Sequence, residues 1–262
     1  MKKHSASLRC SVLVAISLGA PAQQASNDGL KLPARDSAAN PALAQKPVLT
    51  LEQRGDIFMA RKMYREAVET YRQAPDTAIL ANKIGIAYHQ MTLLAQAKKQ
   101  YERAQKLDPK YAEAINNLGT VHYAQKSYRR AVSQYKRALQ LNPNSASIHS
   151  NLGTAYFARK KYTDAFQEYQ TALSLDPEVF EHRNSHGVLL QERSVDERAK
   201  FYFYVAKTYA KSGNTDRALL YIRKAIESGF KERAKFAEDS DFQAMKPLPE
   251  FQELLKLEAR AL

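Results

Sequence analysis

Two histidines are spaced in a way that could hold a metal ion. His182 and His186 lie four residues apart, so a helix would put both imidazoles on one face, as zinc sites require. However, Gly187 follows directly, and the sequence offers no third ligand beyond Glu181 or Glu192. We therefore predict two polar loop histidines here and no metal site.

Motifs for common catalytic chemistry are missing. The sequence has no Gly-rich phosphate loop, no G-x-S-x-G and no H-E-x-x-H. The acidic residues Glu238, Asp239 and Asp241 lack EF-hand spacing, so a helix cap or a solvated turn explains them better than a calcium site. His149 stands where a repeat described below usually has an aromatic residue, and we expect it at the edge of the core. The prediction is a protein that is not an enzyme and uses no cofactor.

Residues 1–22 contain the three parts of an export signal in the right order. Lys2, Lys3 and Arg9 form a positive region, residues 10–19 are apolar, and Ala20 and Ala22 give the small-x-small cleavage pattern. The apolar run is shorter than the roughly 20 residues of a membrane span. The alternative is an N-terminus that merely happens to be apolar. We predict a signal peptide and an exported protein, periplasmic or secreted, which disfavours nucleic acid as a partner.

The single cysteine, Cys10, follows Arg9 and stands at the start of the apolar run instead of after it, which is the wrong order for a lipoprotein signal. Cleavage after Ala22 leaves no cysteine for catalysis or for a disulfide. Residues 23–47 are rich in Ala, Gln, Asn, Ser and Pro and predict a flexible linker. No other segment is long and apolar enough to span a bilayer, so we expect no integral membrane span.

The chain then repeats itself every 34 residues. The stretch "NNLGTVHYAQKSYRRA" from Asn116 returns as "SNLGTAYFARKKYTDA" from Ser150. Units 78–111, 112–145 and 146–179 align without gaps. Each unit has Gly at its eighth place, Ala at its twentieth, Tyr at its twenty-fourth and Ala at its twenty-seventh, and each has a Pro near its end. Apolar residues fall on the faces of two successive helices, joined in the second of these units by "AQKSY". Each unit therefore predicts a helical hairpin that must stack on its neighbours to bury its apolar face.

This pattern resembles the tetratricopeptide repeat, whose signature is L-G-x2-Y, then A-x3-F, then P at a 34-residue period. "NLGTAYF", "DAFQEY" and "LDP" between Asn151 and Pro177 come close to it. The resemblance implies an all-α fold, an α-α superhelix (solenoid) of helix-turn-helix repeats with a C-terminal capping helix.

Two further units are weaker. Residues 48–77 are four residues short, with Arg54 where Leu is expected, and residues 199–230 have Ala206 instead of Gly and no closing Pro. Residues 180–198 interrupt the period as an insertion, in which Ser194 and Glu197 predict a capping box. Residues 231–262 predict a C-terminal cap, whose last helix begins near Pro249 with an apolar face of Phe251, Leu254, Leu255 and Leu257.

In this repeat family the first helices line the concave side, where ligands bind, through the second, fifth, ninth and twelfth places of each unit. We call these positions the first-helix stripe. Asparagine there can hold a peptide backbone, and aromatic rings can receive side chains. The resemblance thus implies a peptide-binding groove formed by Asn82, His89, Asn116, Thr120, Tyr123, Ser150, Thr154 and Phe157.

The stripe begins with Glu52 and Asp56 and ends with Lys200 and Lys207. One hypothesis is that this charge gradient orients a bound chain, and the alternative is ordinary solvated residues. The prediction from the whole pattern is a non-catalytic scaffold that binds a protein or an extended peptide. By analogy of fold, it would serve an envelope assembly or secretion complex.

The formal net charge of +13 points to a second function. Such an excess raises anionic polymers, anionic lipid surfaces or acidic proteins as partners. The cations gather at the turns between helices and on second helices, where we expect Arg61, Lys62, Lys98, Lys99, Lys126, Arg129, Arg130, Lys136, Arg137, Arg159, Lys160 and Lys161. The alternative prediction is a binder of an anionic polymer or an envelope surface through this basic edge, although a merely solubilising surface also explains it.

Overall fold

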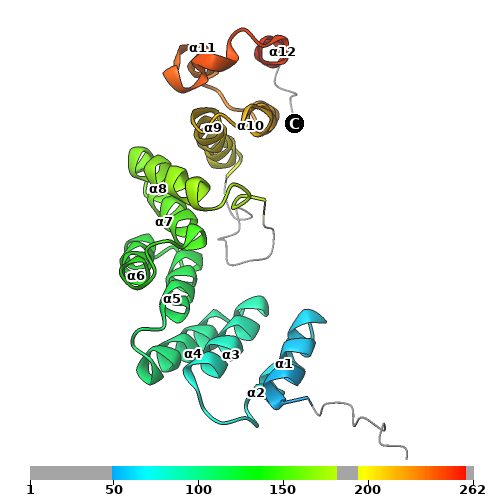
Figure 1. Ribbon diagram of the computed structural model, residues 1–262, viewed down its shortest axis with the longest axis vertical. Coiled ribbons are helices and arrows are strands. Elements are labelled where there is room, and N and C mark those ends of the chain that lie inside the picture. Colours follow the sequence, from blue (N-terminus) through cyan, green and yellow to red (C-terminus); the bar gives the residue numbers. More distant parts are fainter. Residues whose placement is uncertain (1–48, 182–193, 258–262) are drawn as a thin grey trace, which may run out of the picture. The chain divides into compact units, whose positions relative to one another are not determined.

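The computed structural model describes residues 49–181 and 194–257, in which helices and their connections are the whole of the secondary structure (Figure 1). The first eight helices form four hairpins, and each helix packs against its neighbours along the chain. They are α1 (Leu51–Ala60) with α2 (Tyr64–Tyr71), α3 (Ala78–Gln90) with α4 (Leu94–Leu107), α5 (Ala112–Ala124) with α6 (Tyr128–Leu141), and α7 (Ala146–Ala158) with α8 (Tyr162–Leu175).

A fifth hairpin and a C-terminal segment follow. These are α9 (Val195–Lys211) with α10 (Thr215–Glu227), then α11 (Ala234–Glu238), the 3-10 helix η2 (Ser240–Met245) and α12 (Pro249–Lys256). Helix α9 begins within the predicted insertion, because the Ser194 hydroxyl caps it by accepting from the backbone N–H of Glu197 at 3.2 Å. The all-α fold of stacked helical hairpins is confirmed. The predicted signal peptide, the linker and His182 with His186 lie outside the described residues.

Capping side chains determine where several helices begin. Thr50 Oγ1 accepts from the backbone N–H of Gln53 at 3.1 Å, and Gln53 Oε1 accepts from the backbone N–H of Thr50 at 2.9 Å. This reciprocal pair is a capping box for α1. Thr77 caps α3 and Asn214 caps α10 through their side-chain oxygens. Each cap satisfies an N–H group that the first turn of a helix leaves without a partner.

The turn inside each hairpin uses one residue with a left-handed backbone. Lys62, Thr92, Lys126 and Lys160 have φ of 58–60°, and Gly213 has φ of 78°. In the third hairpin the backbone N–H groups of Lys126 and Ser127 donate to the carbonyls of Tyr123 and His122, both at 2.8 Å, which closes the end of α5. Glycine adopts this conformation without the steric cost that a β-carbon adds.

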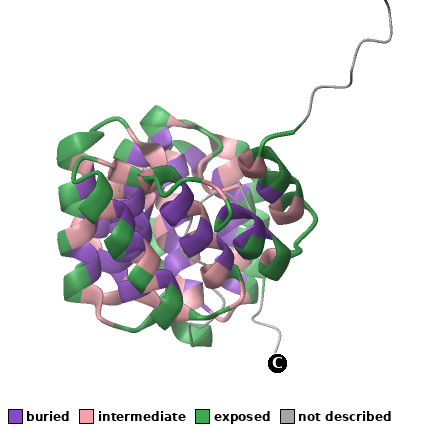
Figure 2. Cartoon of the chain, turned by 90° about the horizontal axis from the view of Figure 1, so that it is seen from below, coloured by how far each residue is buried: buried purple, intermediate pink, exposed green. Residues whose placement is uncertain are grey.

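The recurring glycines and alanines are core positions. In the first four hairpins the tyrosine of the second helix lies directly over the glycine of the first, as in Gly85 with Tyr101. The alanines at the twentieth and twenty-seventh places, such as Ala97 and Ala104, are fully buried. Buried residues fill the space between the helices, and exposed residues lie on the outer sides (Figure 2). The repeated pattern therefore encodes close contact between the two helices of a hairpin.

The C-terminal segment packs by aromatic side chains. Phe236, Phe242 and Phe251 are fully buried and belong to the same core cluster as α9 and α10. Helix α12 begins at Pro249, and Phe251 and Leu254 face the core as predicted. Leu257 was predicted on that face, but it follows the helix and is 40% exposed. No helix among the described residues is long and apolar enough to cross a membrane.

Candidate peptide-binding surface

The eight residues predicted to bind a peptide differ in accessibility. Asn82, Asn116, Thr154 and Phe157 are buried, with 2–5% of each residue exposed. The other four, His89, Thr120, Tyr123 and Ser150, are partly exposed. Burial lowers the pKa of His89, so this side chain is neutral at pH 7. The predicted residues therefore divide into a buried group that supports the stripe and a partly exposed group at its surface.

The buried asparagines form a ladder between neighbouring hairpins. Asn117 Nδ2 donates to Asn82 Oδ1 at 2.9 Å, and Asn151 Nδ2 donates to Asn116 Oδ1 at 3.0 Å. Asn116 Nδ2 donates in turn to Asn117 Oδ1 at 3.3 Å. Each inter-hairpin bond joins the fifth place of one unit to the sixth place of the next. The amides that we predicted would hold a peptide backbone thus already hold one hairpin to another.

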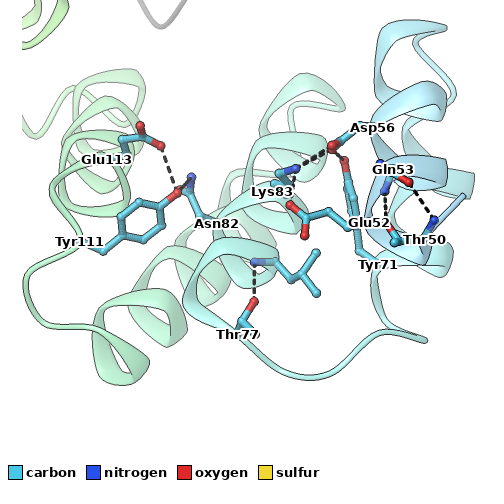
Figure 3. Close-up of polar contacts among 11 residues, drawn as sticks. Thr50, Glu52, Gln53, Asp56, Tyr71, Thr77, Asn82, Lys83, Tyr111 and Glu113 are labelled. Carbon is cyan, nitrogen blue, oxygen red and sulfur yellow. Dashed lines mark hydrogen bonds and ion pairs between the residues drawn. The ribbon is translucent and has the colours of Figure 1, made fainter.

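The same register joins the first two hairpins through charged groups (Figure 3). Lys83, at the sixth place, extends its Nζ to 2.7 Å from Glu52 Oε1 and to 2.8 Å from both carboxylate oxygens of Asp56. Burial works against the charge of Lys83, but its bonds to Asp56 and Glu52 raise its pKa above the usual value. The acidic start of the stripe is therefore partly compensated by a lysine from the next hairpin.

Tyrosine hydroxyls anchor the ninth place of three units. Tyr71 donates to Asp56 Oδ1 at 2.6 Å, and Tyr135 and Tyr169 donate to Thr120 Oγ1 and Thr154 Oγ1, each at 3.3 Å. Burial, and then the bond to Asp56, raises the pKa of Tyr71. Tyr71 therefore remains a protonated donor at neutral pH. The sequence contained part of the signal for these contacts, because the tyrosine recurs at the 34-residue period, whereas the ninth place has Ile86 in the second unit.

A further tyrosine links the ladder to an acidic residue. Tyr111 donates its hydroxyl proton to Glu113 Oε2 at 3.0 Å and accepts from Asn82 Nδ2 at 3.3 Å (Figure 3). Burial, followed by the charge of Glu113, raises the pKa of Tyr111 to about 12. Glu113 itself is exposed at the second place of its unit, so it adds a negative charge to the surface of the stripe.

The stripe of the fifth hairpin is occupied by the chain itself. Phe203 stacks on Phe230 with ring centroids 4.7 Å apart and also contacts Phe236 and Phe242. Lys207 Nζ lies 2.6 Å from Asp239 Oδ2 and 3.2 Å from Asp241 Oδ2, and Lys200 Nζ lies 3.5 Å from Glu232 Oε1. The predicted basic end of the stripe is therefore ion-paired within the chain.

In the fourth hairpin aromatic side chains cover Phe157, the twelfth place of the stripe. Phe157 meets Phe201 and Tyr204 with ring centroids 5.9 and 6.0 Å apart, and Tyr162 stacks on Tyr204 at 5.3 Å. By contrast, Leu49 and Ile79, at the second places of the first two units, are 47% and 49% exposed. Ile86 and His89 are partly exposed beside them. The exposed aliphatic and acidic side chains of the stripe, Leu49, Ile79 and Glu113 among them, therefore lie on the first three hairpins, and Ser150 of the fourth hairpin is partly exposed.

Two other groups of residues are explained by local structure. Asp239 accepts from the backbone N–H of Asp241 at 3.1 Å and caps η2, which confirms the helix cap predicted for the acidic cluster. His149 Nδ1 lies 2.7 Å from Glu168 Oε2, and its Nε2 lies 2.9 Å from the carbonyl oxygen of Pro143. Its side chain is 14% exposed, so it lies at the edge of the core. Within residues 49–181 and 194–257 no three His, Cys, Asp or Glu side chains form a metal-binding group.

The basic edge includes the left-handed lysines of the turns. Lys62, Lys126 and Lys160 are exposed, and so is Arg61 beside them. Among the described residues, none of these four cations has an ion-pair partner, whereas Lys161 approaches Asp164 at 3.4 Å. Exposed cations without partners leave a positive potential along the turns.

Comparison with known proteins identifies the repeats. A TPR repeat model matches residues 119–158, and tetratricopeptide repeat models match residues 146–179 and residues 80–111 and 199–228. No curated protein sequence matches the chain. Among solved structures, the chain is similar to a crystal structure of MamA, with 22% identity and a TM-score of 0.47 over 69% of this chain and 96% of that chain. It is also similar to MamA AMB-1, with 21% identity and a TM-score of 0.47 over 69% of this chain and 98% of that one. Residues 80–111, 119–179 and 199–228 of this chain thus match models of the tetratricopeptide repeat, the family that the 34-residue period resembles.

Proposed function

We propose that the protein is a non-catalytic scaffold that binds a protein or an extended peptide on the first-helix stripe of its first three hairpins. The observation that carries this proposal is that the large apolar side chains of the stripe differ in how far they are exposed to solvent. Ile79 and Leu49, at the second place, are about half exposed, whereas Phe157 at the twelfth place and Phe203 at the fifth place of later units are buried by aromatic partners. Large apolar side chains left at the surface of a rigid, partly polar face are typical of protein-binding sites.

The asparagine ladder makes this face rigid. Its hydrogen bonds join the second, third and fourth hairpins, and Lys83 joins the first hairpin to the second. These contacts leave few side-chain rotamers to be ordered when a partner binds. A preorganised surface binds more tightly than a mobile one of the same composition, because less conformational entropy is lost. In this account the asparagines position the stripe, while Ile79, Ile86 and His89 meet the partner.

The test is an affinity pull-down from an envelope extract with the purified chain. The variant carries Ile79→Asp and Ile86→Asp, and the matched control carries Leu220→Asp, at an exposed leucine of α10. We expect a protein that the wild type and the control retain and the double variant loses, with unchanged circular dichroism in all three. Equal capture by all three would refute binding through the stripe.

A second candidate function is binding of an anionic polymer or an envelope surface through the basic edge. The observation in its favour is that Lys62, Lys126 and Lys160 lack ion-pair partners among the described residues. The test is sedimentation with vesicles of anionic phospholipid at low and high salt, because such binding weakens as ionic strength rises. The variant Lys126→Gln/Lys160→Gln would bind less than Lys106→Gln, whose lysine lies elsewhere on an exposed helix position.

We also propose that the protein is exported to the periplasm or beyond and serves an envelope assembly or secretion complex. The support is the order of charged, apolar and small residues in residues 1–22. Cell fractionation of the full chain beside a variant with Val12→Asp and Val14→Asp tests this. Export of the wild type and retention of the variant in the cytoplasm are the expected results. A cytoplasmic wild type would refute the proposal.

A further inference from the structure

The fifth hairpin shows how a chain segment lies on the first-helix stripe. Three of its stripe residues, Lys200, Phe203 and Lys207, all contact residues from the segment 230–241. The contacts match in chemistry, because the two lysines form ion pairs with carboxylates and the phenylalanine packs against aromatic rings. The occupant of a basic and aromatic stripe is thus acidic and aromatic. This internal example identifies the places through which the stripe recognises a segment.

The same places in the first three hairpins carry the opposite charge. Glu52, Asp56 and Glu113 contribute three carboxylates, and Lys83 contributes one ammonium group, which the first two carboxylates share. His89 adds no positive charge at pH 7, because burial lowers its pKa. This part of the stripe therefore has an excess of negative charge, although the chain as a whole is strongly basic.

Two carboxylate oxygens are available for a partner. Glu52 uses Oε1 for Lys83, and Glu113 uses Oε2 for Tyr111. Within the described part of the chain, the other oxygen of each carboxylate has no hydrogen-bond partner, and an ionised carboxylate accepts on both oxygens. The hairpin between theirs adds apolar surface, since Ile79 of α3 is 49% exposed and Ile86 is partly exposed.

From this arrangement we infer that the stripe of the first three hairpins recognises a polypeptide segment that carries Lys or Arg beside aliphatic side chains. The inference rests on the proposed function and names the chemistry of its partner. The cations of the segment pair with Glu52 and Glu113, and its aliphatic side chains cover Ile79 and Ile86. Charge complementarity of this kind supplies specificity and faster association, and it rejects segments of the opposite charge.

The experiment measures binding of the purified full chain to a positional-scanning library of octapeptides at low salt. Wild type is compared with Glu52→Gln/Glu113→Gln and with the control Glu69→Gln, an exposed carboxylate of α2 away from the stripe. We expect enrichment of Lys or Arg next to Leu, Ile or Val. The affinity for the best such peptide should fall about tenfold in the double variant and stay unchanged in the control, as for two partly exposed charge pairs.

The outcomes separate this inference from the proposed function. Binding of peptides without a preference for Lys or Arg would overturn the inference and leave the scaffold function standing. A preference for acidic peptides, lost in Lys126→Gln/Lys160→Gln, would overturn it and assign binding to the basic edge. If no peptide binds while the pull-down identifies a partner through Ile79 and Ile86, recognition of a linear segment is wrong. If both experiments fail, the proposed function fails too.

Discussion

Gly119 and Tyr135 form one contact unit: a β-carbon on Gly119 would lie 2.6 Å from Cε1 of the Tyr135 ring. The ring is fully buried, so it cannot move aside into solvent. We predict that Gly119→Ala destabilises the protein by about 1–3 kcal/mol, the cost of overpacking a well-filled core. Urea unfolding followed by circular dichroism measures this change.

The fifth hairpin supplies a control for this contact. There the glycine place is Ala206 and the tyrosine place is Ile222, both fully buried. In this hairpin the first helix carries a β-carbon at Ala206, and the facing side chain of the second helix, Ile222, is smaller than tyrosine. We expect the double variant Gly119→Ala/Tyr135→Ile to be more stable than the sum of the two single changes predicts. Simple additivity would show that the pair is not coupled.

We predict that replacing Thr92, the left-handed residue of the second hairpin's turn, by glycine stabilises the protein. Its φ of 60° is costly for a β-branched residue, whereas Gly213 serves the same turn in the fifth hairpin. Thr92→Gly should therefore stabilise the protein by about 1 kcal/mol in thermal or urea unfolding. Lys99→Gly, at an exposed interior position of the next helix, should instead destabilise it by a similar amount. A loss of stability in Thr92→Gly would contradict the strain argument.

Because Asn116 belongs to the asparagine ladder, we predict that its substitution lowers the stability of the fold, although the sequence assigned this residue to ligand binding. Asn116→Ala removes one acceptor of Asn151 Nδ2 and one donor to Asn117 Oδ1. Because these atoms lie in buried side chains, we expect a loss of about 2 kcal/mol in the free energy of unfolding. Asn144→Ala, at an exposed position between the third and fourth hairpins, is the control and should change little. Full stability in Asn116→Ala would mean that the ladder contributes nothing.

The fold was largely predictable, because the information that specifies a hairpin lies within one 34-residue unit. Gly119, Ala131 and Tyr135 recur with the period, and the helices that they predict are present. What lies between units was harder to foresee. Asn82 and Asn116 fall on the face expected to bind a ligand, but only the register of stacking brings Asn117 and Asn151 to their amides.

The cover over the fifth hairpin could not be predicted from periodicity. The segment that contacts Phe203 runs from Phe230 through the five-residue helix α11 into the 3-10 helix η2, and both helices are too short to show an amphipathic period. The sequence did not indicate against which surface its phenylalanines, among them Phe236 and Phe242, would pack and become buried. Lys200 and Lys207 were therefore predicted as open stripe residues, whereas the structure pairs both with acidic residues of that segment.

Histidine burial predicts a loss of stability in mild acid. Burial, and then the positive charges of Lys98 and Arg130, lowers the pKa of His122, while Glu102 works in the opposite direction. The unfolded imidazole has a pKa of about 6.5. Protonation therefore favours the unfolded state once the pH falls below that value, and the stability that neutral His122 contributes above it is lost. The variant His122→Gln should lose less stability than the wild type between pH 7.5 and pH 5.5 in urea titrations, and an equal loss would contradict this.

The most direct test of the central claim is site-specific photo-crosslinking. Benzoylphenylalanine is introduced at Ile79 or Ile86 on the stripe and, for comparison, at Lys99, an exposed residue on the second helix of the same hairpin. The account predicts that one partner protein crosslinks from both stripe positions and not from Lys99. Crosslinks that form from Lys99 and are absent from Ile79 and Ile86 would contradict it and place the binding surface on the second helices.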